Sequence, residues 1–261
     1  MELDIYQIDA FTDKIFGGNP ACVIPLKEWL PDNTLLKIAQ ENSVSETAFF
    51  IDNGTSVKLR WFTPELEMDL CGHATLATAH CMKSLLNYPN DTIHFETLSG
   101  TLAVSINNGS YSLDLPSRPP ISATLPLFIK SSLNIQPLEV FKSRDYLLLY
   151  DSEEQIKNIQ IKRQNFDKVS LGTGGVIVTA KGENCDFVSR FFTPQASILE
   201  DPVTGSSHCS LIPFWSSRLQ KTQLTAIQLS HRGGVLSCEN KNDRILLTGS
   251  AKTYLVGKIR V

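Results

Sequence analysis

Short alternations of apolar and polar residues recur along the chain and predict a protein built mainly of strands. A helix is expected after Pro31-Asp32-Asn33 to about residue 40, and a largely apolar one from His73 to about Leu85. A third is expected after Gly205, where Pro213 would kink or shorten it. The clearest strand candidates are 3–9, 21–26, 47–51, 56–62, 91–97, 101–106, 110–115, 176–178, 187–192, 225–230, 234–238 and 243–249.

The same pattern occurs twice. Phe62-Thr63-Pro64 recurs as Phe192-Thr193-Pro194, 130 positions later, and the offset then becomes 133 and stays constant, as in the pairs Gly72 and Gly205, Thr92 and Thr225, and Gly100 and Gly233. A period of this length is too long for a solenoid repeat, which has roughly 20 to 50 residues. The sequence therefore predicts two pseudo-symmetric lobes of α+β class, each a sheet or barrel wrapped around one buried helix. A cleft between two lobes is a favoured place for a small ligand.

The proline-rich segment 116–120 marks the boundary between the lobes. We assign residues 1–117 to the N-terminal lobe and 118–261 to the C-terminal lobe. The last segment, about 252–261, is an extra strand without a counterpart in the first half. Its pattern allows it to return to the sheet of the first lobe.

Composition excludes several classes of protein. Of the 261 residues, 42% are hydrophobic and 20% charged, as in ordinary globular proteins. The formal net charge of -3 comes without a basic block, which argues against nucleic-acid binding. No apolar run approaches the ~20 residues that cross a bilayer, and the acidic start of the chain differs from a signal peptide. We expect a cytoplasmic protein that does not bind membranes.

The cysteines and histidines do not form a recognisable metal motif. None of the six cysteines is arranged as CxxC, so most should be buried, reduced thiols. His73 and His80 would share one helix face, but no carboxylate stands at a ligand spacing beside them. We therefore expect no metal site.

The two duplicated helix starts are the first candidates for chemistry. Gly72 and His73 in the first half correspond to Gly205 and Ser206 in the second. A glycine lets the backbone approach a ligand closely, and the free N–H groups and dipole of a helix start attract anions. Two such starts facing one cleft would hold a carboxylate or a developing enolate. The alternative is that each glycine only eases a tight turn.

Glu46 is the second candidate, because it places one carboxylate at the head of an apolar strand. Partial burial would raise its pKa toward the range useful for proton transfer. A surface glutamate, or a capping partner of Ser43, is the alternative. The equivalent stretch 171–175 contains no acid, so a base here would act from one lobe only.

Cys71 and Thr204 occupy the same place in the two halves, directly before the glycine. A thiol beside a helix start can act as a base or nucleophile, although an inert buried cysteine is commoner. Asp201 precedes the second turn, where it either caps the turn or orients a catalytic group or a substrate amine.

Several motifs in their order resemble the PhzF-like (phenazine biosynthesis-like) family. They are Asp-Ala-Phe-Thr at 9–12, Gly-Asn-Pro at 18–20, Ser-Glu-Thr-Ala-Phe at 45–49, Arg-Trp-Phe-Thr-Pro at 60–64, Cys-Gly-His-Ala-Thr-Leu-Ala at 71–77 and Glu-Asp-Pro-Val-Thr-Gly-Ser at 200–206. They extend over most of the chain, and their combination is far more specific than any one of them.

The resemblance implies the diaminopimelate epimerase-like fold and an isomerase without metal or cofactor, usually a homodimer. It implies that Glu46 shuttles the proton and that Gly72, His73, Asp201 and Ser206 line the substrate site. With the residues considered above, the expected site comprises catalytic Glu46, His73 and Asp201, and substrate-binding Asn19, Gly72, Thr204, Gly205 and Ser206.

Three hypotheses follow. The first is an isomerase that moves a proton on a small carboxylate-bearing substrate, with Glu46 as general acid and base. The second is a Cys71-dependent epimerase or hydroxyproline-type dehydratase, since those relatives of the fold carry a thiol before the glycine. Here Thr204 replaces the second thiol, which argues against a symmetric two-thiol epimerase. The third is a binding or dimerisation module without catalysis.

Overall fold

The computed structural model describes residues 1–261 and divides into two compact units. Unit 1 comprises Met1–Leu115 and Leu247–Val261, and unit 2 comprises Pro116–Leu246. The division falls at the start of the proline-rich segment 116–120. No helix combines the length and the apolarity that crossing a membrane requires.

Unit 1 is a barrel of strands. Going around it, β17 pairs antiparallel with β1, β1 antiparallel with β2, β2 parallel with β3, β3 antiparallel with β4 and β4 parallel with β6. Strands β6, β7 and β8 continue antiparallel, and β8 pairs with β17, which closes the ring. The strands are β1 (Glu2–Ala10), β2 (Asn19–Pro25), β3 (Glu46–Asp52), β4 (Val57–Phe62), β5 (Glu67–Met68), β6 (Thr92–Thr97), β7 (Gly100–Asn107), β8 (Ser110–Pro116) and β17 (Arg244–Arg260).

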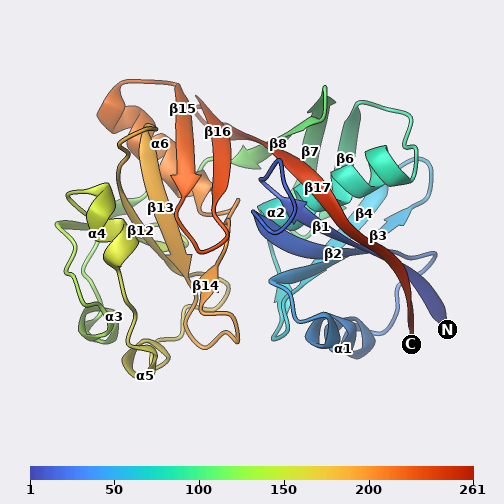
Figure 1. The fold of residues 1–261 in the computed structure, drawn as a ribbon, viewed down its shortest axis with the longest axis horizontal. Coiled ribbons are helices and arrows are strands. Elements are labelled where there is room, and N and C mark those ends of the chain that lie inside the picture. The colour runs from blue at the N-terminus through green and yellow to red at the C-terminus, as the bar shows by residue number, and fades with distance from the viewer. The chain divides into compact units, whose positions relative to one another are not determined.

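The helix α2 (Gly72–His80) packs against β1, β2, β3 and β7, and it lies among these strands in Figure 1. Eight of its nine residues are buried, and most of them are glycine, alanine or threonine. Small side chains let strands approach the helix closely, so these residues suit a helix enclosed by a sheet. The helix continues as a π-helical turn, η1 (Cys81–Leu85), while α1 (Asp32–Asn42) packs outside on β3 and β4.

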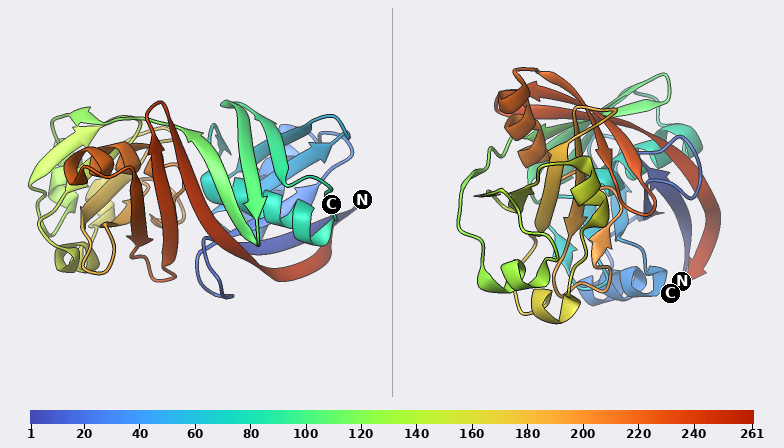
Figure 2. Two further views of the ribbon diagram at one scale, coloured as in Figure 1. Left: turned by 90° about the horizontal axis from the view of Figure 1, so that it is seen from above. Right: turned by 60° about the vertical axis from the view of Figure 1, so that its left-hand side comes forward.

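The C-terminal strand is longer than the sequence pattern indicates. Two strands are expected, at 243–249 and about 252–261, but β17 runs without interruption from Arg244 to Arg260. A register shift opposite Gln7 and Ile8 accommodates one extra residue. The two chain ends lie side by side (Figure 2), and the Val261 N–H donates to the Met1 carbonyl at 2.9 Å.

Unit 2 repeats the succession of pairings found in unit 1. Strand β11 pairs parallel with β12, β12 antiparallel with β13, β13 parallel with β15 and β15 antiparallel with β16, as in the series β2, β3, β4, β6 and β7. The strands are β9 (Ile121–Ser122), β10 (Glu139–Lys142), β11 (Tyr146–Leu149), β12 (Val176–Lys181), β13 (Phe187–Phe192), β14 (Glu200–Asp201), β15 (Gln223–Gln228) and β16 (Gly234–Lys241).

The main helix of unit 2, α6 (His208–Leu219), packs against β15 and β16. Trp215 donates its indole N–H to Thr179 Oγ1 on β12 at 2.9 Å and stacks on Phe187 of β13. The expected shortening at Pro213 does not occur, because the helix continues to Leu219. Proline cannot donate to the carbonyl four residues earlier. That carbonyl, of Cys209, instead accepts the N–H of Arg118 at 2.8 Å.

Three further helices of unit 2 fall in a region for which the sequence predicts no element. They are α3 (Leu127–Ser132), α4 (Glu153–Asn158) and α5 (Arg163–Phe166). Each has only four to six residues, too few to show helical periodicity. Strand β11 could have been predicted, because Tyr-Leu-Leu-Leu at 146–149 is a short apolar run typical of a buried strand. All four residues are buried.

Candidate active site

Glu46 and His73 face each other in unit 1. Glu46 is the first residue of β3 and His73 the second residue of α2, and Glu46 Oε2 lies 3.1 Å from His73 Nε2. Both residues are buried, with 9% and 2% of their surface exposed. Because α2 lies against β3, the helix start and the strand start bring together two residues 27 positions apart.

The contact between these two groups is an ion pair without an aligned hydrogen bond. Neither Glu46 Oε2 nor His73 Nε2 has a hydrogen-bond partner, although both atoms are buried. A buried polar atom without a hydrogen bond costs free energy, typically about 1–3 kcal/mol. Both atoms thus keep the capacity to bond to a molecule that enters the site.

Asn19 contacts the other ring nitrogen of His73. Its Nδ2 lies 3.1 Å from His73 Nδ1, and the side chain is fully buried. The loop before it is shaped by Gly18, which has φ +60, and a Cβ on Gly18 would meet the Ala10 carbonyl oxygen at 2.1 Å. Asp9, near the end of β1, accepts the N–H of Phe16 in this loop at 2.9 Å. The family-like motifs at 9–12 and 18–20 therefore position Asn19 against His73.

Cys71 lies on the same side of His73 as Asn19, with Sγ 3.6 Å from Nδ1. Burial raises the pKa of the Cys71 thiol, and the nearby Glu46 carboxylate raises it further. Cys71 therefore stays a neutral thiol at neutral pH.

His73 holds its proton. Burial alone would lower the pKa of His73, but the adjacent Cys71 and Glu46 side chains raise it well above its usual value. Because Cys71 is a neutral thiol, the Glu46 carboxylate is the charge that retains this proton. The pair can thus offer a base and an acid to one substrate.

The start of α2 adds backbone donors to this cluster. Its N-cap is Cys71, which has an extended conformation and makes no side-chain capping hydrogen bond. The first N–H groups of a helix have no partner within the helix, and the positive end of its dipole lies there. Gly72 therefore belongs to a helix start that can stabilise negative charge.

In unit 2, Gln228 holds Asp201 and Thr204 together. Gln228 accepts the Thr204 N–H at 2.8 Å and donates to the Asp201 carbonyl at 2.8 Å, and Thr204 Oγ1 donates to Asp201 Oδ2. Gln228 is fully buried at the end of β15. The sequence did not single out Gln228 as a functional candidate. It could have done so, because the alternation of β15 places this polar residue on the buried face with Leu224 and Ala226.

Ser206 accepts a hydrogen bond from Arg144. The sequence did not single out Arg144 as a site residue either. Arg144 Nη2 donates to Ser206 Oγ at 2.8 Å, and the guanidinium pairs with Asp145 through two contacts of 3.3 Å. Asp145 accepts the Gly175 N–H at 2.8 Å. A cation thus lies beside the segment 204–206 that leads into α6, and such a charge favours an anionic ligand.

His208 begins α6 and stays neutral. Burial lowers its pKa to about 4, against the opposing effect of its hydrogen bond to the Thr204 carbonyl. Its Nδ1–H donates to that carbonyl at 2.8 Å, and this bond fixes the turn that contains Gly205.

The structure brings the predicted residues together in two groups. In unit 1, Asn19, Glu46, Cys71 and His73 form one cluster at the start of α2. In unit 2, Asp201, Thr204 and Ser206 lie within one bonded turn before α6. That the two groups act on one substrate stays a prediction from the duplicated sequence.

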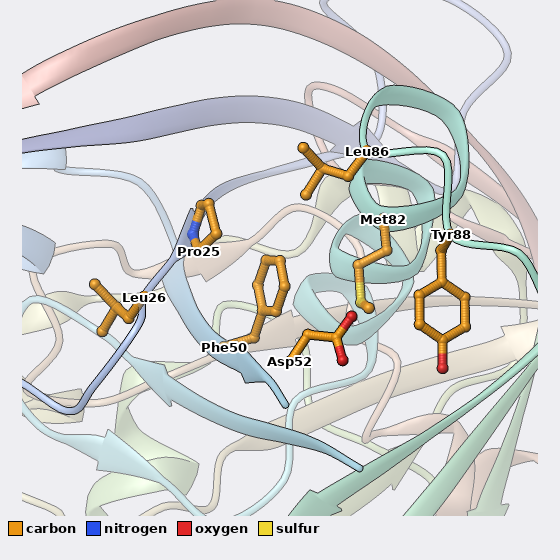
Figure 3. Close-up of a pocket in the computed structure, with 7 residues that line it drawn as sticks. All are labelled: Pro25, Leu26, Phe50, Asp52, Met82, Leu86 and Tyr88. Carbon is orange, nitrogen blue, oxygen red and sulfur yellow. The ribbon is translucent and has the colours of Figure 1, made fainter. Parts of the chain in front are cut away.

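Unit 1 also contains a cavity away from this cluster (Figure 3). Its volume is about 200 Å³, and it lies at the opposite end of β3 from Glu46, with Asp52 and Tyr88 as its polar members. The other lining residues are Pro25, Leu26, Phe50, Met82 and Leu86. None of the predicted site residues lines it.

Glu46, Cys71 and His73 can each offer one metal-ligating atom, and these atoms lie within 4.8 Å of one another. The sequence pattern points instead to His73 and His80, which lie at opposite ends of α2. His80 instead bonds to Tyr111 and Thr253.

Comparison with known proteins is consistent across the whole chain. The model of the family described as "Phenazine biosynthesis-like protein" matches residues 8–257. A protein of Pseudomonas aeruginosa named an uncharacterized isomerase is 44% identical over 262 residues, with all of both chains covered. A phenazine biosynthesis protein of the PhzF family from Enterococcus faecalis has a TM-score of 0.92 and 43% identity, again over all of both chains. A predicted epimerase from P. aeruginosa shares the fold, with a TM-score of 0.76 over 99% of both chains, at 17% identity.

Proposed function

The chain belongs to the PhzF (phenazine biosynthesis-like) family, and we propose that it is an isomerase that moves a proton on a small carboxylate-bearing substrate, with Glu46 as general acid and base. The observation that carries this proposal is the buried pair of Glu46 and His73 at the start of α2. Relatives that match 98–100% of the chain are named isomerases.

Proton transfer starts at the Glu46 carboxylate. It takes a proton from a carbon beside the substrate carboxylate or within a conjugated ring and returns it to another carbon. A positioned general base contributes roughly 10²- to 10⁴-fold to the rate. Burial excludes water from this step, so the proton passes between Glu46 and the substrate.

Negative charge develops on the substrate when the proton leaves. The protonated His73 and the free N–H groups at the α2 start, including that of Gly72, are suited to stabilise it. Each such donor is worth roughly 3–4 kcal/mol in a transition state. Asn19 lies against His73 Nδ1, and once His73 is protonated the Asn19 amide oxygen is the atom that can accept the Nδ1 hydrogen and keep the ring in place; Asn19 is therefore a positioning residue as well as a candidate for substrate binding.

The residues of unit 2 are proposed to bind the substrate. Gly205 and Ser206 supply backbone and hydroxyl donors, Thr204 holds Asp201 beside them, and Arg144 adds a positive charge. Asp201 accepts from Thr204 and is available to orient a polar group of the substrate. The duplicated sequence supports their action at the same site as Glu46.

The thiol mechanism is less well supported than the glutamate mechanism. A catalytic cysteine works as a thiolate, and burial together with Glu46 raises the pKa of Cys71. The matching residue in the second half is Thr204, which cannot serve as a thiol partner. Glu46 is thus the better candidate for the base.

The test first needs a substrate. Small cyclic amino acids and dienoic acids can be screened in D₂O for solvent deuterium in the product, since a carboxyl proton can exchange before it is returned. The variant Glu46→Gln then removes the base and nearly preserves its volume. We expect turnover to fall by roughly 10²- to 10⁴-fold, with ligand binding retained.

The matched control is Asp52→Asn, at the other, exposed end of the same strand. It should keep full turnover. Undiminished turnover in Glu46→Gln would overturn the proposal and make Cys71 the leading candidate. Absence of deuterium alone would not, because a shielded proton can return without exchange.

A further inference from the structure

An arginine–glutamate pair is duplicated along with the helix starts. Arg60 on β4 donates from Nε and Nη2 to the two carboxylate oxygens of Glu67 on β5, at 2.7 Å each. In unit 2, Arg190 on β13 donates from the same two nitrogens to Glu200 on β14, at 2.7 and 2.9 Å. The arginines are 130 positions apart and the glutamates 133, which are the two offsets of the repeat. Such two-pronged pairs fix geometry as well as supplying binding energy.

The surroundings of the two pairs are duplicated as well. The guanidinium carbon of Arg60 lies 5.1 Å from the ring centre of Phe62, and that of Arg190 lies 4.9 Å from the ring centre of Phe192. Each phenylalanine is also the strand partner of the glutamate in its unit. In both turns that follow, the threonine of the Phe-Thr-Pro motif donates its N–H to a leucine carbonyl at 2.9 Å. The Phe-Thr-Pro repeat therefore builds the same local structure twice.

Each pair holds a very short strand that leads into a helix start. Strands β5 and β14 have two residues each and pair only with β4 and β13. Strands in globular proteins usually have three to ten residues, so these two have few ladder hydrogen bonds to hold them. The segment after β5 contains Cys71 and Gly72, and Asp201 is itself the second residue of β14. The position of the proposed site residues thus depends on how firmly β5 and β14 are held.

We propose that Arg60 and Arg190 are positioning residues that fix the entries to the two helix starts. Arg60 acts through Glu67 on the segment that leads to α2. Arg190 acts through Glu200 on Asp201 and on the turn that leads to α6. The kinetic consequences rest on the proposed function, whereas the fixing of the two segments does not depend on it.

The two arginines should affect different kinetic constants, because the two units are proposed to act in different steps. Lysine keeps the positive charge but cannot make the two-pronged contact. Arg60→Lys should loosen the α2 start beside Glu46, so we expect kcat to fall roughly tenfold with KM nearly unchanged. Arg190→Lys should loosen the turn that contains Ser206, so we expect KM to rise roughly tenfold with kcat nearly unchanged.

Arg218→Lys is the matched control. Arg218 also donates to both carboxylate oxygens of a glutamate, Glu139, at 2.9 Å, and it lies over the ring of Phe214. It belongs to the last turn of α6, away from the helix start, and should leave both kinetic constants unchanged. If the duplicated pairs only stabilised the fold, the variants of Arg60 and Arg190 would show the same kinetic pattern. That result would overturn the proposal.

The glutamates provide a second, independent set of variants. Glu67→Gln and Glu200→Gln remove the charge and nearly preserve the volume of the side chain. Each should reproduce the kinetic pattern of its own arginine variant. Disagreement within a pair would overturn the proposal, because the arginine would then act through another partner, such as Asp32 for Arg60.

Amide hydrogen exchange tests the fixing of the segments without a substrate. Exchange should become faster in peptides covering 67–72 for Arg60→Lys and 200–206 for Arg190→Lys, and in neither for Arg218→Lys. Unchanged exchange in both segments would overturn the proposal and leave the glutamate mechanism in place. Faster exchange together with undiminished turnover in Glu46→Gln would support the positioning role and contradict only the proposed function.

Discussion

The two duplicated helix starts share a backbone pattern but differ in charge. Strand β3 begins with Glu46, whereas β12 begins with the apolar Val176. Before α2 the chain offers a thiol and then a protonated imidazole. Before α6 the equivalent positions are Thr204 and Ser206, whose hydroxyls are bonded to Asp201 and Arg144. The duplication thus preserved a helix start in each unit, and we propose that the first serves proton transfer and the second anion binding.

The histidines at the two helix starts illustrate the same contrast. His73 lies beside the Glu46 carboxylate, and this charge outweighs burial and raises its pKa. His208 is equally buried, but its polar contacts are a backbone carbonyl and a serine hydroxyl, so burial lowers its pKa to about 4. Burial therefore does not decide the charge of a histidine; the neighbouring ionised group does.

After Glu46→Gln, the largest effect should come from His73→Gln. Glutamine keeps a polar contact with Asn19 but cannot carry the proton, so we expect turnover to fall by roughly 10²- to 10³-fold, the loss typical of a charge-stabilising donor. In the unaltered enzyme, activity should persist through neutral pH and decline on the alkaline side, where His73 loses its proton. Steady-state rates across pH provide the measurement, with the exposed His94→Gln as control. Equal turnover rates for His73→Gln and His94→Gln would show that the charge of His73 does not contribute to catalysis, so that the two helix starts do not differ in charge stabilisation.

The next effect concerns stability. The folded pKa of His208 is about 4 and the unfolded value about 6.5, so the unfolded chain binds more protons between these two pH values. The free energy of unfolding should therefore fall by up to about 3 kcal/mol from His208 alone as pH drops from 6.5 to 4. The raised pKa of His73 has the opposite sign: its contribution is present below pH 6.5 and is lost as pH rises through the folded value.

Urea unfolding at pH 4.5 and 7.5 measures this dependence. His208→Gln should lose part of the difference between the two pH values, and His94→Gln should keep all of it. Identical pH dependence in the unaltered protein and His208→Gln would mean that His208 is not held neutral by the fold.

Ser206→Ala tests the proposed anion site of unit 2. It removes the hydroxyl that Arg144 contacts, and we expect KM to rise roughly tenfold with little change in kcat, as for one hydrogen bond to a charged group. Ser217→Ala, an exposed serine on the same helix α6, is the control. A fall in kcat at constant KM would place Ser206 in the chemical step and weaken the division of roles between the units.

The smallest effect should come from Cys71→Ala. A neutral thiol contributes packing and a weak contact to His73, so turnover should stay within roughly threefold, and iodoacetamide should inhibit only weakly. A loss of several orders of magnitude with an intact circular dichroism spectrum would favour the thiol mechanism.

The sequence by itself determined the local elements and the residue types of the site. Alternation of apolar and polar residues predicts the strands around α2 and α6, since each strand has one buried face. The repeated Phe-Thr-Pro and glycine positions identify the two helix starts. Family-like motifs pick out Glu46, His73 and Asp201 because they depend on residue type and order, which the sequence states directly.

Only the tertiary structure decided which residues meet. Glu46 reaches His73 because α2 packs against β3, and Arg144 reaches Ser206 across 62 positions of the chain. Closure of the barrel by β17, and the Arg118 N–H that satisfies the Cys209 carbonyl opposite Pro213, are equally long-range. Local periodicity carries no information about such contacts, because they depend on the pairing of strands far apart in sequence and on the burial that this pairing creates.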